Sequence, residues 1–186
     1  MSLLRPSERD LTVDGRRLHL LDWGGDRRPP LLLLHGFTGH AHAWDTLAIA
    51  LQPHFHVMAL DARGHGDSDP ADVYDSAGSF RDLSSVVEQL GLRARDDGRL
   101  VWKWHPSIKE RRVMGDVDWW AIVREIKPPL LLLRGAESTV LDADVAERMA
   151  RELPRGTLVE IPRAVHTLHE DNPEAVLDAL RAFLKF

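Results

Sequence analysis

Two short, unbroken runs of apolar residues stand out along the chain. The first is four leucines at residues 31–34, preceded by Pro29-Pro30 and followed by His35-Gly36. The second is four leucines at residues 130–133, also preceded by two prolines and followed by a glycine. Such a run is typical of a parallel strand that is covered on both faces. We therefore predict that both runs are strands in the middle of one sheet.

Other segments have the patterns of strands and of a hairpin. Asp14-Gly15 lies between the strand-like residues 12–13 and 16–20, which predicts an antiparallel hairpin. Residues 56–61 and 157–161 are further predicted strands, each followed by polar, turn-rich sequence.

Segments with helical periodicity alternate with these strands. Apolar residues recur at three- and four-residue steps in 83–90 and 145–153. A third helix is predicted after Asn172-Pro173, an N-cap residue followed by a proline at the first helical position. Strands that alternate with helices indicate an α/β fold, here a layered, mostly parallel sheet with helices on both faces.

Composition narrows the class of protein. The 186 residues predict a single domain, 1–186, and 44% hydrophobic residues predict a packed core. The net charge is −5 and the basic residues are scattered, which argues against nucleic acid as a partner. Cysteine is absent, so disulfides, thiolate metal sites and a cysteine nucleophile are excluded.

The distribution of apolar residues also bears on location. No apolar window approaches the length of a membrane span, and the N-terminal residues have no run of signal-peptide length. We expect a soluble, cytoplasmic protein with no membrane partner.

Tryptophan is concentrated between residues 93 and 127. Four of the six tryptophans lie there, namely Trp102, Trp104, Trp119 and Trp120. They are interpreted as core or subunit-interface residues, or as the wall of an apolar pocket.

Three motifs in chain order carry a resemblance to a known family. Residues 34–39 follow the first apolar run, Asp61-Ala62-Arg63-Gly64-His65-Gly66-Asp67-Ser68 follows the next strand, and Val165-His166 follows the last one. With these motifs the chain resembles the α/β-hydrolase fold family. The resemblance implies that His166 is a catalytic base, because imidazole exchanges protons near neutral pH.

The loop at Gly36-Phe37 is a candidate oxyanion site. A backbone N–H there, that of Phe37 first, would point into a cleft at the carboxyl ends of the strands. The alternative is a tight turn that needs Gly36 for its geometry.

The family's nucleophile motif, Gly-x-Ser-x-Gly, is missing from the sequence. The chain passes from Leu92 almost directly to residues that resemble the family's sequence downstream of the cap, so we infer an internal deletion near residues 92–95. Ser138 is the first candidate for a substitute nucleophile, because it occupies a family acid position. Ser68 is the second candidate.

The acid that orients the base is also altered. Relatives place an Asp three or four residues after the glycine that follows the strand at 130–133, where this chain has Ser138 and Thr139. Glu137 is the nearest carboxylate and could orient His166, or it is an ordinary surface residue. Asp142 and Asp144 are interpreted as the start of the next helix.

A metal site is a weaker alternative. His40 and His42 with Asp45 offer a His-x-His pair and a carboxylate, and a zinc-activated water could hydrolyse esters without a serine. In a helix, however, residues i and i+2 point apart. We expect no metal and no cofactor.

The predicted function is weak hydrolysis of small carboxylic esters. The alternative is a catalytically inactive binding or assembly protein, which the missing nucleophile motif favours. The deletion would also leave residues 31–34 and 130–133 with unpaired edges. We expect these two strands to pair with each other, or a second chain to complete the sheet in a homodimer.

Overall fold

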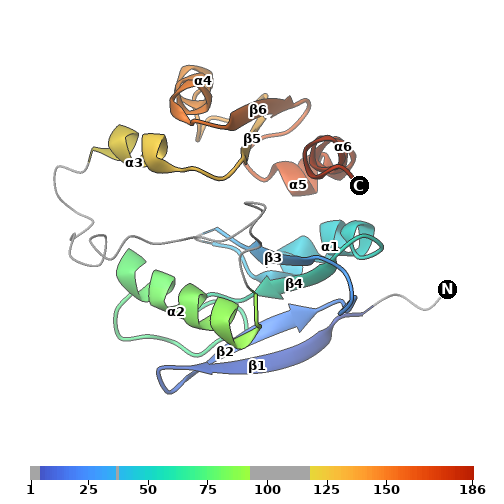
Figure 1. Ribbon diagram of the computed structural model, residues 1–186, viewed down its shortest axis with the longest axis vertical. Coiled ribbons are helices and arrows are strands. Elements are labelled where there is room, and N and C mark those ends of the chain that lie inside the picture. Colours follow the sequence, from blue (N-terminus) through green and yellow to red (C-terminus); the bar gives the residue numbers. More distant parts are fainter. Residues whose placement is uncertain (1–4, 37, 93–117) are drawn as a thin grey trace. The chain divides into compact units, whose positions relative to one another are not determined.

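The computed structural model describes residues 5–36, 38–92 and 118–186 (Figure 1). The chain divides into two compact units, residues 1–93 and 94–186, and each is described by itself. None of the described helices is long and apolar enough to cross a membrane. Residues 93–95 of the inferred join near 92–95, together with Trp102 and Trp104, lie outside the described residues.

Unit 1, residues 1–93, is built on a four-stranded sheet. Its strands are β1 (Ser7–Val13), β2 (Arg16–Asp22), β3 (Pro30–Leu34) and β4 (His56–Leu60). The strand order is β1-β2-β4-β3, in which β3 and β4 are parallel and the other neighbours are antiparallel. The outer strands are therefore β1 and β3.

The predicted hairpin between β1 and β2 is confirmed. Asp14 and Gly15 have φ angles of 50° and 74°, which is the geometry of a two-residue turn that suits the twist of the strands. The turn sets the register that pairs Val13 with Arg16 and Asp10 with His19.

One face of the unit 1 sheet is covered by helix α2 (Ser76–Gln89). Val86 on α2 packs against Met58 and Leu60 of β4 and against apolar residues of the hairpin. The buried members of this cluster are Leu11, Val13, Leu18, Leu20, Met58, Leu60 and Val86.

The opposite face is covered by the short 3-10 helix η1 (Ala41–Trp44) and α1 (Asp45–Leu51). Val57 and Ala59 are buried and alternate along β4 with Met58 and Leu60, so they point to this second face. The expected arrangement of helices on both faces of a sheet is therefore present.

Unit 2, residues 94–186, holds a two-stranded parallel sheet, β5 with β6. Its described elements are α3 (Trp119–Glu125), β5 (Leu130–Gly135), α4 (Ala143–Glu152), β6 (Gly156–Ile161), α5 (Leu168–Asp171) and α6 (Pro173–Leu184). Helix α6 starts as predicted, since the Asn172 side chain accepts a hydrogen bond from Ala175 N and Pro173 follows it.

The prediction that both apolar runs lie in one sheet is not met by the described pairings. Residues 31–34 pair with β4 in one sheet, whereas residues 130–133 pair with β6 in another. Apolar composition predicts that a strand is covered, but it does not specify which strand lies beside it.

The two tryptophans of α3 differ in their surroundings. Trp119 is 58% exposed, while the ring of Trp120 lies under the guanidinium carbon of Arg148 on α4, 3.8 Å from the ring centroid. A cation over an aromatic face is a favourable contact that links α3 to α4.

Candidate functional site

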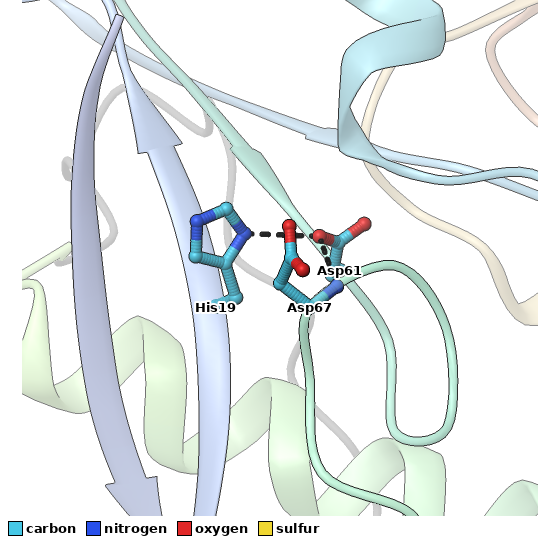
Figure 2. Close-up of side chains that lie close together, drawn as sticks. All are labelled: His19, Asp61 and Asp67. Carbon is cyan, nitrogen blue, oxygen red and sulfur yellow. Dashed lines mark hydrogen bonds and ion pairs between the residues drawn. The ribbon is translucent and has the colours of Figure 1, made fainter.

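A buried carboxylate, Asp61, lies directly after β4. One oxygen, Oδ1, accepts a hydrogen bond from Ala41 N at 2.6 Å. The other, Oδ2, lies 3.0 Å from His19 Nδ1 and 3.2 Å from Asp67 N (Figure 2). Burial raises the pKa of Asp61, but the hydrogen bonds from Ala41, His19 and Asp67 together outweigh it and hold the pKa below its usual range. The carboxylate is therefore ionised inside the unit.

The loop after Asp61 is held closely against it. Gly66 has a φ of 50°, and a Cβ there would lie 2.3 Å from the Asp61 carboxylate, so only glycine fits. Ser68 is 8% exposed, and its hydroxyl donates to Asp61 O at 2.7 Å and accepts from His19 N at 2.8 Å. These bonds hold residues 64–68 in a compact turn, and they engage the hydroxyl of the second candidate nucleophile.

A buried ion pair joins the same loop to α2. Arg63 donates to both oxygens of Asp82, at 2.6 and 2.7 Å, and to Gly78 O at 2.8 Å. The hydrogen bond to Asp82 raises the pKa of Arg63 above its usual value. This paired, bidentate geometry fixes the loop without leaving a buried charge uncompensated.

The loop after β3 is tied to the loop after β4 through His35. Its Nε2 accepts from Ala62 N at 3.0 Å, and its Nδ1 lies 2.7 Å from Gly36 O. This places Gly36 at the carboxyl end of β3, as predicted. Phe37, whose N–H is the first candidate oxyanion donor, lies outside the described residues.

In unit 2 the loops after β5 and β6 lie side by side. Glu137 N donates to Ala164 O at 3.0 Å, two residues before His166. A Cβ on Gly135 would lie 2.0 Å from Val165 O, so glycine is required where the two loops cross. The side chains of Glu137 and His166 are both exposed, and no hydrogen bond joins them within the described residues.

Ser138 is buried beside these loops, with 7% of its surface exposed. Its hydroxyl oxygen accepts from Val140 N at 3.3 Å and from Leu141 N at 3.4 Å. No hydrogen bond to His166 accompanies these in the described part of unit 2. The Ser138 hydroxyl oxygen therefore faces the backbone amides of Val140 and Leu141 in its own loop.

Among the described residues, one group of side chains has the composition of a metal site. His19, Asp61 and Asp67 each offer one ligand atom, all within 4.8 Å of one another. However, Nδ1 of His19 is hydrogen-bonded to Asp61, and its buried Nε2 points away from both carboxylates (Figure 2). The nitrogen nearest to the carboxylates is thus already used by the protein.

Among the described residues, the predicted alternative metal ligands His40, His42 and Asp45 do not form a group of three neighbouring ligand atoms. The ring centroids of His40 and His42 are 6.3 Å apart, and His42 Nδ1 lies 3.1 Å from both carboxylate oxygens of Asp45. Asp45 is the first residue of α1, so this contact ties η1 to α1.

Sequence reasoning missed the contacts centred on Asp61. The signal was available, because a carboxylate at the end of an apolar strand must find donors when it is buried. The partners could not be named, since His19 and Ala41 are 42 and 20 residues distant in sequence.

Comparisons with known proteins give a consistent result. The family described as alpha/beta hydrolase fold matches residues 29–102. Epoxide hydrolase 3 of Mus musculus is 31% identical over 134 residues, covering 66% of this chain and 36% of that protein. A bifunctional esterase/perhydrolase of Acinetobacter calcoaceticus is 34% identical, covering 76% of this chain and 52% of that protein. The chain spans about a third of the length of the first curated relatives that it matches.

Solved structures are similar in fold. E-2-(acetamidomethylene)succinate hydrolase aligns with a TM-score of 0.78 at 17% identity, covering 97% of this chain and 100% of that one. Naproxen esterase of Bacillus subtilis aligns with a TM-score of 0.80 at 16% identity, covering 97% of this chain and 92% of that one.

Proposed function

Because this chain belongs to the α/β-hydrolase fold family, we propose that it is a weak hydrolase of small carboxylic esters. In this proposal His166 is the general base, Glu137 orients it, and the backbone at Gly36 and Phe37 supplies an oxyanion donor. No cofactor takes part. The cytoplasmic location stays a prediction.

The observation that carries the proposal is the contact between the loops after β5 and β6. Glu137 N donates to Ala164 O, and Gly135 leaves room for the carbonyl of Val165. In this proposal the Glu137 carboxylate and the His166 imidazole act from these adjacent loops as the acid and base of a catalytic triad.

The proposed nucleophile is Ser138, with Ser68 second. Ser138 is carried on the same loop as Glu137, whereas both hydrogen-bonding capacities of the Ser68 hydroxyl are engaged by the backbone. An attack by Ser138 requires its hydroxyl to leave the amides of Val140 and Leu141. That rearrangement is one reason to expect a low rate.

A second candidate function is a binding or assembly protein without catalytic activity. The engagement of the Ser68 and Ser138 hydroxyls by backbone groups favours it. So does the exposure of Trp119 on α3, an apolar surface that a partner could cover.

A homodimer that completes the sheet is part of the proposal. The outer strand β1 carries polar residues at Ser7, Glu8, Arg9 and Asp10, which protect a sheet edge, whereas β3 has no charged residue and Leu34 is 44% exposed. We expect β3 to pair with a strand of a second chain. Light scattering on a sizing column should show a dimer that Leu34→Lys weakens and that Glu8→Lys does not.

Labelling with a fluorophosphonate probe separates the two functions. A hydrolase reacts at an activated hydroxyl, and intact mass of the parent and of the Ser138→Ala and Ser68→Ala variants identifies which one. Absence of any adduct, together with no acyl-enzyme from a short-chain aryl ester, would leave the binding protein or a metal-bound water. An aryl epoxide should be assayed beside the ester, because several similar proteins are named epoxide hydrolases.

A further inference from the structure

The loop after β5 is wrapped around one buried guanidinium, that of Arg134. Its Nε donates to Leu141 O at 2.8 Å, its Nη2 to Ser138 O at 3.2 Å and its Nη1 to Ala136 O at 3.3 Å. A fourth bond, from Nη1, reaches Glu160 Oε1 on β6 at 2.7 Å. One side chain therefore holds three carbonyls of a six-residue loop and a side chain of the adjacent strand.

The position of Glu137 in this arrangement is the important point. It lies between Ala136 and Ser138, whose carbonyls both accept from Arg134, and its own N–H is bonded to Ala164 O in the loop of His166. The backbone of Glu137 is thus fixed from both sides. The Glu137 side chain remains exposed to solvent.

The chemistry of arginine suits this task. A guanidinium has five N–H donors in a rigid fork, whereas a lysine ammonium is a single point that cannot reach carbonyls in several directions. The bond to Ser138 O is buried and the bonds to Ala136 O and Leu141 O are half-buried, so losing these donors is costly and the loop conformation depends on the arginine.

We propose, as an inference that rests on the proposed function, that Arg134 is a positioning residue that holds Glu137 against the His166 loop. It acts through the loop backbone and does not touch the ester. The ion pair with Glu160 contributes less than the carbonyl bonds, because the Glu160 side chain is 53% exposed.

Amide hydrogen exchange, measured by NMR on the full chain, tests this proposal without depending on activity. In Arg134→Met the amides of Ala136 and Glu137 should exchange at least about tenfold faster, while the amides of β5 residues 131–133 change less than about twofold. Arg134→Lys should restore only part of the protection. Glu160→Gln should have a small effect.

The exposed Arg151 on α4 is the matched control, and Arg151→Met should leave these amides unchanged. Unchanged exchange at Glu137 in Arg134→Met, or equal acceleration throughout β5, would overturn the positioning role. Ester hydrolysis tests the proposed function separately, since Arg134→Met should lower kcat about tenfold at unchanged KM. A parent without esterase activity refutes the proposed ester hydrolysis. The exchange result then still tests whether Arg134 positions Glu137.

Discussion

The two units of this chain bury their apolar residues to very different extents. In unit 1 the hairpin, β4, α1 and α2 bury large apolar side chains on both faces of the sheet, among them Leu18, Leu20, Leu21, Leu51 and Met58. In unit 2 the four leucines of β5 are only half-buried. The buried apolar residues described there are Ala146, Leu153, Ile161, Ala164 and Val176.

The unit with the larger core is therefore not the unit that carries the proposed acid and base. Unit 1 has its own core and its own buried polar network around Asp61. Unit 2 carries the proposed acid and base on loops fixed by Arg134 and Gly135, but its sheet has only two strands. Small sheets need further strands or covering surfaces to be stable by themselves. We therefore expect unit 2 to depend on additional pairing and unit 1 to be the more stable part.

The largest expected effect tests the two cores directly. Leu20→Ala removes a fully buried side chain and should lower the free energy of unfolding of unit 1 by about 3 kcal/mol. Leu132→Ala in half-buried β5 should cost about 1 kcal/mol in unit 2. Hydrogen exchange followed by mass spectrometry reports the stability of each unit separately. An equal loss of free energy of unfolding in the two variants would contradict the difference between the two cores.

A glycine pair sharpens the account of unit 1. Gly66→Ala places a Cβ against the Asp61 carboxylate and should destabilise unit 1 by about 2 kcal/mol. Gly15→Ala has a similar positive φ but open space around it, so only the backbone strain of about 1 kcal/mol remains. Urea unfolding of both variants measures the difference. If the two variants lose the same free energy of unfolding, the contact of the new Cβ with Asp61 contributes nothing to the loss in Gly66→Ala.

The smallest effect is a dependence on pH. The folded-state pKa of Asp61 is lowered, so its contribution is fully present above the unfolded value of about 3.8 and is lost as pH falls through the folded value. Asp22, also with a lowered pKa, acts in the same direction. Unit 1 should lose stability on the order of 1 kcal/mol below about pH 4. Asp61→Asn should reduce this loss of stability at low pH. An unchanged loss would exclude Asp61 as its source.

Local patterns in the sequence predicted the elements well. Asp14-Gly15 predicted the turn, Asn172-Pro173 predicted the start of α6, and the apolar run at 130–133 predicted β5, because each depends on neighbouring residues only. The edge strands and the partners of Asp61 could not be predicted in this way. They depend on contacts between residues far apart in sequence.

The positions of some candidate residues in the fold were predicted, while their roles stay predictions. The positions of Gly36 and His166 after strands β3 and β6 follow from the order of motifs and strands. The engagement of Ser68 and Ser138 by backbone groups could not be foreseen, since a hydroxyl does not reveal its partner in a linear sequence. The contacts of Arg134 with its loop and with Glu160 could not be predicted either, because the sequence shows only an Arg-Gly pair at the end of an apolar run.

The most direct test of the account is the rate of hydrolysis of a short-chain aryl ester by His166→Ala. The account predicts a loss of at least about 10²-fold relative to the parent, because general-base catalysis is removed. The exposed His54 in unit 1 is the control, and His54→Ala should keep the parent rate. An unchanged rate in His166→Ala would contradict the account and make His166 a residue without a catalytic role.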